Sequence, residues 1–244
     1  MPKFSHLHCH TQFSLLDGAA KIPDLINKAK IDGQPAVAIT DHGNMFGAFH
    51  FVNQAQKAGV KPIVGCEFYL VEDRHRQQFS RGEKDIRHHQ LLLAKNQIGY
   101  QNLSKLCSLG YMEGLYGKYP RIDKSLLVKY KEGIIATSCC IGAEIPQTIL
   151  KQGKEAAEQK LKWWLEQFGS DYFIEIQRHG LKNIDNTGMS QEDVNQILIG
   201  FAKKNDLNII ATNDSHYTEE EDFNAHDILL CVNTGDFKNT PIGQ

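Results

Sequence analysis

The chain lacks several features that would assign it to a specialised class of protein. Its 244 residues contain no apolar stretch near the ~18 residues needed to span a membrane. The opening Met-Pro-Lys-Phe-Ser-His has no apolar core of a signal peptide. Lysine and arginine total 27 against 29 acidic residues, a net charge of -2, so the positive excess of an unaided nucleic-acid binder is missing. We therefore expect a cytoplasmic protein that binds DNA only as part of something larger.

The six cysteines form neither a C-x-x-C pair nor the regular ladder of a disulfide-rich secreted scaffold. We interpret them as reduced, and most of them as small core residues, because free cysteine is often buried. Cys140 is the exception that we expect to act chemically, with its neighbour Cys139 as the rival candidate.

Short apolar runs alternate with helical patterns along the whole chain. Seven runs are strand candidates: 4–9, 36–40, 62–71, 90–95, 134–138, 172–177 and 209–212. Helical patterns lie between them, at 23–33, 44–58, 96–109 and 154–168, and possible capping boxes at Ser190-x-x-Asp193 and Thr218-x-x-Glu221 open the last two helices. The alternation predicts one α/β domain with a mostly parallel sheet and right-handed crossovers.

Side chains that bind metals follow four of these runs directly. The clusters are His8 and His10, Asp41 and His42, Cys139 and Cys140, and Asp214 and His216. In a βα barrel the carboxyl ends of all the strands meet at one face, where distant segments assemble a site. Because such residues follow most strands, we favour a closed barrel over an open doubly wound sheet, which has one switch point.

The spacing of these residues favours metal ligation over structural roles. His8 and His10 are two apart on a strand, so they share one face, and His6 is a weaker candidate on that face. Asp214 and His216 repeat the spacing, and Thr218 is a better helix cap than Asp214.

His42 has no structural role to explain it, whereas its neighbour Asp41 could cap a helix. Glu67 lies inside an apolar run, where a carboxylate is costly unless it meets a cation or a salt bridge.

Three further features stay open on spacing alone. His88 and His89 are adjacent and point in different directions, and both precede their apolar run. Residues 72–88 form a charged loop that is either a solvated insertion or a phosphate-contacting rim that includes Arg74. Arg178 and His179 are further weak candidates for phosphate contact.

Taken together, these motifs resemble the PHP family of metal-dependent phosphoesterases. The resemblance is carried by His-Leu-His-Cys-His at 6–10, Ile-Thr-Asp-His-Gly at 39–43, Glu67, and Asn-Asp-Ser-His at 213–216. Residues 13–18, 64–69, 89–96, 138–144, 175–180 and 211–217 are similar to the branch of the family found in alpha subunits of bacterial DNA polymerase III. The resemblance implies one PHP domain over residues 1–244, the N-terminal fragment of a longer subunit whose polymerase core is absent.

The family has a distorted seven-stranded TIM-like βα barrel and a site for two to three divalent ions. By resemblance the ligands are His8, His10, Asp17, His42, Glu67, His89, Cys140, Asp214 and His216. The resemblance thus selects His89 over His88 and adds Asp17, which spacing does not reveal. A thiolate favours zinc at one position, and the carboxylates also accept manganese.

The implied chemistry is phosphoester hydrolysis, in which a metal-bound hydroxide is the nucleophile and no protein side chain takes that role. For this branch we expect a 3′-5′ exonuclease that trims primer ends beside the polymerase. A non-catalytic module that docks the polymerase core or a proofreading subunit is the first alternative. A stand-alone phosphatase acting on a small phosphate monoester is the second.

Overall fold

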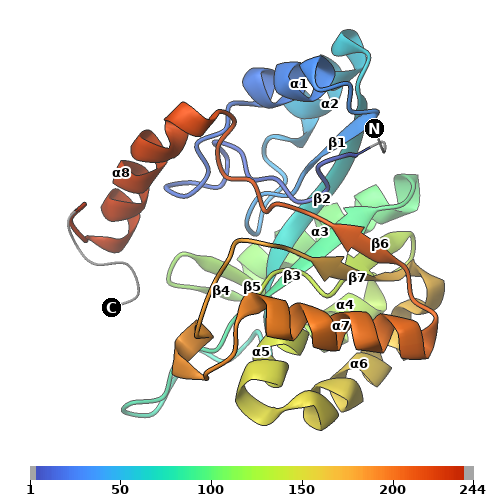
Figure 1. The fold of residues 1–244 in the computed structure, drawn as a ribbon, viewed down its shortest axis with the longest axis vertical. Helices are drawn as coiled ribbons and strands as arrows, with labels where there is room; N and C mark the ends of the chain where they lie inside the picture. Colours follow the sequence, from blue (N-terminus) through green and yellow to red (C-terminus); the bar gives the residue numbers. More distant parts are fainter. Residues whose placement is uncertain (1–3, 239–244) are drawn as a thin grey trace.

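The computed structural model describes residues 4–238, which form a mixed α/β domain (Figure 1). The strands are β1 Ala36–Ile39, β2 Lys61–Val71, β3 His88–Ala94, β4 Leu115–Tyr116, β5 Tyr119–Asp123, β6 Ile134–Thr137, β7 Tyr172–Ile176 and β8 Ile209–Ala211. The helices are α1 Ile22–Ile31, α2 Ala48–Ala58, α3 Gln97–Glu113, α4 Lys124–Lys129, α5 Glu144–Gln152, α6 Lys154–Phe168, α7 Gln191–Asn205 and α8 Phe223–Thr234. Six of the seven predicted strands are confirmed, and the short strands β4 and β5 were not predicted.

The strands follow one another around the domain in the order β1, β2, β3, β6, β7 and β8, and β5 and β4 extend from the far end of β2. The pairs β1–β2, β6–β7 and β7–β8 are parallel, as predicted. β3 departs from the prediction, because it runs antiparallel to both of its neighbours, β2 and β6. The start of β3 therefore lies at the edge where the parallel strands end.

The predicted strand at 4–9 is wrong as a regular strand, yet the segment occupies a strand's place. The amides of Ala38 and Thr40 donate to the carbonyls of His6 and Cys9, at 2.8 and 2.9 Å. From the first of these bonds to the second, the chain advances by two residues on the β1 side but by three in the segment at 4–9. The extra residue forms a bulge, which interrupts the regular pairing.

On its other side the same segment pairs with the chain that follows β8. The His10 amide donates to the Ser215 carbonyl at 2.7 Å, and the Ser215 amide donates to the His8 carbonyl at 3.1 Å. We call this pairing of residues 8–10 with 213–216 the seam. It joins the chain after β8 to β1 through the first segment, and so closes the strands into the distorted barrel expected from the sequence.

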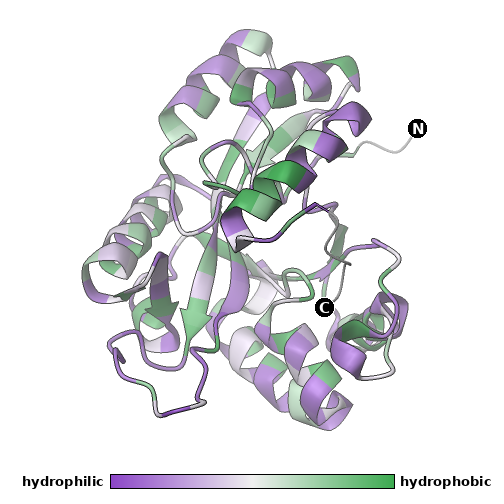
Figure 2. Ribbon diagram, turned by 90° about the vertical axis from the view of Figure 1, so that its left-hand side faces the viewer, coloured by the Kyte–Doolittle hydropathy of each residue, from purple (hydrophilic) through white to green (hydrophobic). Residues whose placement is uncertain are grey.

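Helices cover the outside of the barrel. In Figure 1, α1 and α2 lie beside β1 and β2 at the top, and α5, α6 and α7 lie at the bottom. Figure 2 shows hydrophobic strands inside and hydrophilic faces of the helices outside. The largest core cluster includes Trp164, Phe201 and Leu103, all fully or almost fully buried.

The helix boundaries test the capping signals. Ser190 caps α7 in a complete capping box with Asp193, as predicted. The box predicted at Thr218 is wrong, because Glu219 and Asp222 make the reciprocal bonds and the Thr218 hydroxyl has no hydrogen-bond partner. The predicted helix 44–58 begins only at Ala48.

The last helix, α8, projects from the rest of the domain (Figure 1). None of its residues is buried, and Phe223, Ile228 and Val232 are exposed. Its outward face is accordingly hydrophobic in Figure 2. Over residues 4–238, no helix combines the length and apolar character required of a membrane span.

Candidate metal centre

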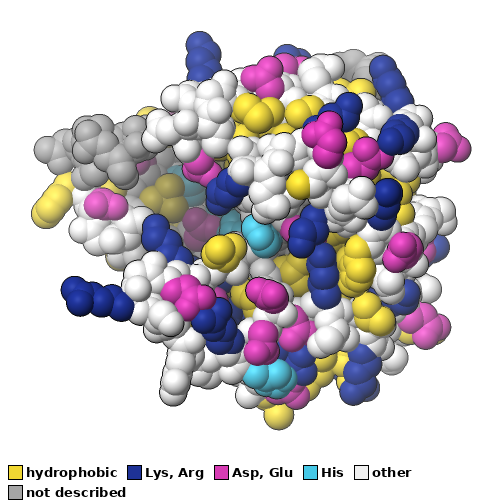
Figure 3. Space-filling view, turned by 90° about the horizontal axis from the view of Figure 1, so that it is seen from below, with side chains coloured by type: hydrophobic (Ala, Val, Ile, Leu, Met, Phe, Trp, Pro, Cys, Tyr) yellow, Lys and Arg dark blue, Asp and Glu magenta, His cyan; other side chains and the backbone are white. Residues whose placement is uncertain are grey.

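All nine predicted ligands meet at one end of the barrel. They come from the first segment, from the turns that follow β1, β6 and β8, from β2 and from the start of β3. Figure 3 views the molecule from below, where histidine and acidic side chains lie in the depth of a hollow. The carboxyl edge of the parallel strands therefore carries the site, as the strand-end clusters predict.

Strand register accounts for three of these positions. The parallel register of β1 with β2 continues past the end of β1 to an isolated bridge between His42 and Glu67, which lies within β2. On the other side of β2, His89 pairs with Tyr69, two residues from Glu67, so both side chains lie on the same face. Gly43 turns the chain just after His42 at a φ of 62°, a conformation that glycine adopts at little cost.

Four donors form the most deeply buried part of the site. The His8 Nε2 atom lies 3.3 Å from Glu67 Oε1 and 3.3 Å from Asp214 Oδ1. The His10 Nε2 atom lies 3.3 Å from Glu67 Oε2 and 3.2 Å from the same Asp214 oxygen. Two ligands of one tetrahedral zinc ion lie about 3.4 Å apart, given bonds of about 2.0–2.2 Å. These four side chains therefore have the spacing of a metal site.

Unpartnered polar atoms support the same conclusion. Five buried atoms that face this centre lie 2.9–3.3 Å from one another but without hydrogen-bond geometry: His8 Nε2, His10 Nε2, His42 Nδ1, Glu67 Oε2 and Asp214 Oδ1. A buried polar atom without a partner is costly, and a cation bound between such atoms removes the cost. The donor set therefore fits divalent metal ions.

Two further groups of donors extend from Glu67. In the first, His42 Nδ1 lies 2.9 Å from Glu67 Oε2, and His89 Nδ1 lies 3.1 Å from Glu67 Oε1 and 3.4 Å from Cys140 Sγ. In the second, Asp17 Oδ2 lies 2.8 Å from His42 Nε2 and 3.2 Å from His216 Nε2. The three groups share members and form one continuous cluster of donors.

The carboxylates make the centre a region of negative potential. Burial alone lowers the pKa of His8, but the charges of Asp214, Glu175 and Glu67 outweigh burial and hold that pKa well above its usual value. Burial acts the same way on His42, yet Glu67 and Asp17 raise its pKa to about 9.

The acidic groups respond in the opposite direction. Burial would raise the pKa of Glu67, but the nearby imidazoles of His89, His42 and His8 hold it well below the usual range. The pKa of Cys140 is also lowered, first by a hydrogen bond with Cys139 and then, against its burial, by His89. A lowered thiol pKa favours the thiolate form that binds metals.

One buried carboxylate behind the histidines, Glu175, was not predicted as functional. The His8 Nδ1 atom lies 2.7 Å from Glu175 Oε1, and the hydroxyls of Thr137 and Thr212 donate to the Glu175 carboxylate at 2.6 Å each. A histidine that donates from Nδ1 to a carboxylate presents Nε2 to a metal in a fixed orientation. The sequence carried the signal for Glu175, because this residue, like Glu67, is an acid inside an apolar run.

His10 is oriented by a relay of the same kind. Its Nδ1 atom lies 3.0 Å from Ser14 Oγ, which donates to Asp41 Oδ1 at 2.7 Å. The Thr11 amide and hydroxyl also donate to Asp41, at 2.6 and 2.8 Å. Asp41 therefore supports a predicted ligand, and it does not cap a helix.

We expect Glu175→Gln to weaken metal binding by about 10- to 100-fold, the usual effect of losing such a supporting carboxylate. Competition with a chelating dye measures the affinity, and Glu166→Gln, on the exposed face of α6, is the matched control. Unchanged affinity in the Glu175 variant would mean that Thr137 and Thr212 leave the imidazole adequately oriented without the charge.

The remaining candidates differ in where they lie. His179 lines the central hollow together with seven of the nine donors, and Arg178 lines an adjoining one. Arg74 lines neither, since its guanidinium pairs with Glu113 and Asp123 at 2.8 Å each.

Three other candidates from the sequence lie beside the ligands. Cys139 Sγ lies 3.2 Å from Glu67 Oε1, but burial raises its pKa well above that of an ordinary thiol. Cys140 is therefore the better thiolate of the pair. His6 and His88 join none of the donor groups in the described part of the chain.

Three hollows meet at this end of the barrel. The central hollow, of about 340 Å³, is lined by seven of the nine donors, all except His8 and His10. Asp17, His42 and His89 also line a second hollow of about 560 Å³. Asp214 and His216 also line a third hollow of about 460 Å³. The three hollows are therefore continuous across the donor cluster.

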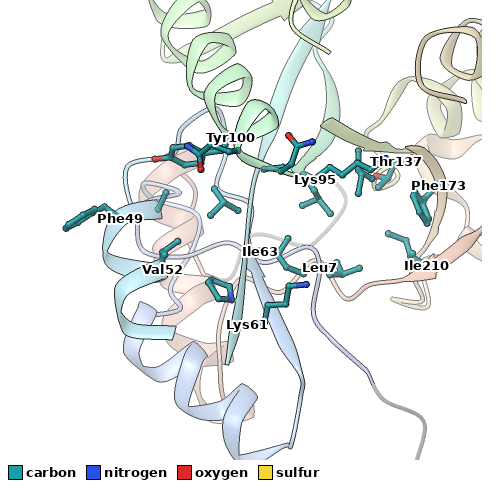
Figure 4. Close-up of a pocket in the computed structure, with 18 of the residues that line it drawn as sticks. Leu7, Phe49, Val52, Lys61, Ile63, Lys95, Tyr100, Thr137, Phe173 and Ile210 are labelled. Atoms are coloured by element: carbon teal, nitrogen blue, oxygen red, sulfur yellow. The ribbon is translucent and has the colours of Figure 1, made fainter. Parts of the chain in front are cut away.

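A larger cavity, of about 690 Å³, lies at the opposite end of the barrel (Figure 4). Its lining is mainly apolar and includes Leu7, Ile63, Phe173 and Ile210. None of the nine predicted ligands lines it, so the largest cavity is not the chemical site.

Metal affinity should rise with pH up to about 9. A ligating nitrogen must be unprotonated, and nearby carboxylates raise the pKa of His42 to about 9 and hold the pKa values of His8 and His89 well above that of an ordinary imidazole. Protons therefore occupy these three imidazoles at neutral pH in the metal-free protein, and the pKa of His216 is raised as well. Each proton released on binding makes affinity fall about tenfold for each pH unit of acidification. The sequence alone placed this window near pH 6, the ordinary range of histidine, and the carboxylates move it upward.

Manganese titrations at pH 6.5, 7.5 and 8.5, corrected for the pH dependence of the indicator, measure this effect. A constant affinity across that range would contradict the assignment of these imidazoles as ligands.

Known proteins are similar to this chain in sequence and in fold. The PHP domain family matches residues 6–179. DNA polymerase III alpha subunits of Borreliella burgdorferi and Thermus aquaticus are 46% and 49% identical over 96% and 94% of this chain. The chain spans about a fifth of the length of these relatives, 20% and 18% respectively.

Among solved structures, a protein assigned as a metal-dependent phosphoesterase from Bifidobacterium adolescentis has a TM-score of 0.54 at 16% identity, over 88% of each chain. An amidohydrolase from Chromobacterium violaceum, with bound sulfate and no metal, has a TM-score of 0.54 at 15% identity, over 88% of each chain. At these identities the likeness concerns the fold alone.

Proposed function

Since the chain belongs to the PHP family and brings the nine predicted ligands together at one end of the barrel, we propose that it is a metal-dependent phosphoesterase that hydrolyses phosphodiesters. The observation that carries this proposal is the set of unpartnered donor atoms of His8, His10, His42, Glu67 and Asp214, which face one another at metal-site spacing. Clusters of exposed acidic residues are common in proteins that bind no ion, whereas the donor atoms of these five residues are buried.

The nine residues would hold two to three divalent ions, with zinc favoured beside Cys140 and manganese acceptable among the carboxylates. Bound ions supply an activated water and neutralise the charge that develops on the phosphate. The protein's own contribution is orientation: Glu175 and Asp41 fix the rings of His8 and His10 from behind. His179, in the central hollow, and Arg178 beside it are placed to contact the phosphate.

We propose DNA as the substrate, because the similar proteins are subunits of a DNA polymerase. We propose a 3′-5′ exonuclease within a replicative polymerase alpha subunit, acting in the cytoplasm beside the rest of that chain. The identity to alpha subunits over nearly the whole chain supports this, and the exposed apolar face of α8 suits contact with further protein.

The test is hydrolysis of a 5′-labelled single-stranded oligonucleotide by purified protein with added Mn²⁺ or Zn²⁺. We expect stepwise shortening from the 3′ end. Turnover no greater than that of a His8→Ala control would end the proposal.

The seam favours a second role, as a metal-braced module on which the polymerase core or a proofreading subunit docks. His8 and His10 on one side of the seam and Asp214 and His216 on the other would be ligands of the same centre, and their side chains lie close together. An ion there ties together two segments that close the barrel, and so stabilises the fold. This role is compatible with catalysis, and it survives if hydrolysis is not observed.

A further inference from the structure

The hollow of about 560 Å³ beside the metal centre is lined differently from the centre itself. Aromatic rings and cations replace most of the imidazoles and carboxylates. We call this hollow the aromatic groove, and its rings and cations are Phe13, Phe46, Tyr69, Tyr111, Tyr119, Arg87 and Lys118. Because Asp17, His42 and His89 line both the groove and the central hollow, whatever lies in the groove is next to the donors.

The rings lead outward from the metal centre. The ring of Tyr69 is stacked on that of His42, with centroids 5.7 Å apart and an interplanar angle of 16°. Tyr119 meets Tyr69 edge to face at 5.1 Å. Farther out, Phe46 and Tyr111 face each other at 6.0 Å, and they are 59% and 37% exposed. Exposed rings contribute little to a core, so this pair is free to contact a ligand.

Positive charge accompanies the rings. The Arg87 guanidinium lies over the Tyr119 ring at 3.7 Å, and the Lys118 ammonium lies 5.7 Å from the same ring. Arg87 also pairs with Asp85 at 2.7 Å, which holds its side chain in place. Among the described residues that line the groove, Asp17 is the one carboxylate, and it faces His42 and His216. Away from the donors, the charged side chains among the described lining residues are therefore the cations Arg87 and Lys118.

We propose that the aromatic groove seats the bases of single-stranded nucleic acid whose terminal phosphodiester lies at the metal centre. The inference rests on the proposed function and adds the part of the substrate that is recognised. Rings beside cations are the combination that binds single strands without sequence preference, because every base can stack and every linkage carries a phosphate. Paired bases in a duplex are already stacked, so the groove selects unpaired ends.

The experiment measures binding without hydrolysis. The probes are two fluorescein-labelled phosphorothioate oligomers of equal length, one of thymidine and one in which every base is absent. Both carry the same charge, so the difference in their affinities isolates base stacking. Fluorescence anisotropy with the Mn²⁺-loaded chain should show tighter binding of the thymidine oligomer.

The variants Phe46→Ala and Tyr111→Ala should each weaken binding of the thymidine oligomer by about tenfold, within the range of one lost base stack. Binding of the abasic oligomer should change much less. The matched control is Phe49→Ala, an aromatic residue on α2 that is 75% exposed but lines the cavity at the other end of the barrel. It should leave both affinities unchanged.

Equal affinity of the unchanged protein for the two oligomers would overturn the inference, and so would an equal loss on both oligomers in the Phe46 and Tyr111 variants. Turnover of bis(4-nitrophenyl) phosphate tests the phosphoesterase proposal separately. A preference for the thymidine oligomer without turnover would support the groove and contradict the catalytic function. Turnover without such a preference would support the catalytic function and contradict the groove.

Discussion

Replacing Glu67 with glutamine is expected to reduce phosphodiester hydrolysis by on the order of 10³-fold, the effect of removing a central charge from a preorganised site. One carboxylate oxygen of Glu67 lies 3.3 Å from His8 Nε2 and 3.1 Å from His89 Nδ1. The other lies 3.3 Å from His10 Nε2 and 2.9 Å from His42 Nδ1. Glutamine has nearly the same shape but no charge, so it removes the group that the other donors share.

Initial rates on a 5′-labelled single strand and the metal content per chain by atomic emission measure this effect together. Glu72→Gln is the matched control, because Glu72 follows the same strand and is exposed. It should retain both activity and metal. Full activity in the Glu67 variant would show that hydrolysis occurs elsewhere, and loss of metal with unchanged activity would separate the donor cluster from the reaction.

Removing the metals should lower the melting temperature by roughly 8–16 °C. An ion present at 1,000 times its dissociation constant stabilises the folded state by about 4 kcal/mol. A chain of this size shifts by about 2–4 °C for each kcal/mol. The largest local effect is expected at the seam, because the proposed ions would join His8 and His10 to Asp214 and His216.

Calorimetric scans with and without a chelator measure the shift, and hydrogen exchange at residues 8–10 and 213–216 locates it. The His8→Ala variant is the control, since a chain that has lost its site should show a smaller response to the chelator. If the chelated and loaded proteins melt at the same temperature, the role of the metals in bracing the fold is excluded.

The carboxyl-edge cluster was accessible to sequence reasoning because its signal is local. His8 with His10 and Asp214 with His216 follow apolar runs at a spacing that places both members on one face. Glu67 is conspicuous because an acid inside an apolar run needs a partner. These rules require no knowledge of which strands are neighbours.

What the sequence left open depends on long-range arrangement. His89 precedes its apolar run, and it reaches the ligand edge because β3 runs antiparallel to β2. The hydrophobic pattern of a strand is the same in either direction, so the residues of β3 do not reveal that it is antiparallel to its neighbours. Asp17 was identified through family resemblance alone, since its approach to His42 and His216 depends on the turn at 11–18.

Supporting residues were harder to find than the ligands they orient. Asp41 bonds Ser14 and Thr11, which are distant in sequence, and a helix cap was an equally good interpretation. The bulge between His6 and Cys9 likewise depends on pairing with β1, and no turn residue in this stretch predicts it. The short strands β4 and β5 carry little hydrophobic pattern of their own.

The seam can form only late in biosynthesis, because its two sides lie far apart in the sequence. A ribosome delivers His8 and His10 early, but their partners Asp214 and His216 leave the exit tunnel some two hundred residues later. Until then the early imidazoles have only part of their binding partners, and the barrel has a gap beside β1. If these residues hold metals as proposed, the metals would bind late in the synthesis of this domain, and nascent chains arrested before Ser215 should bind them weakly.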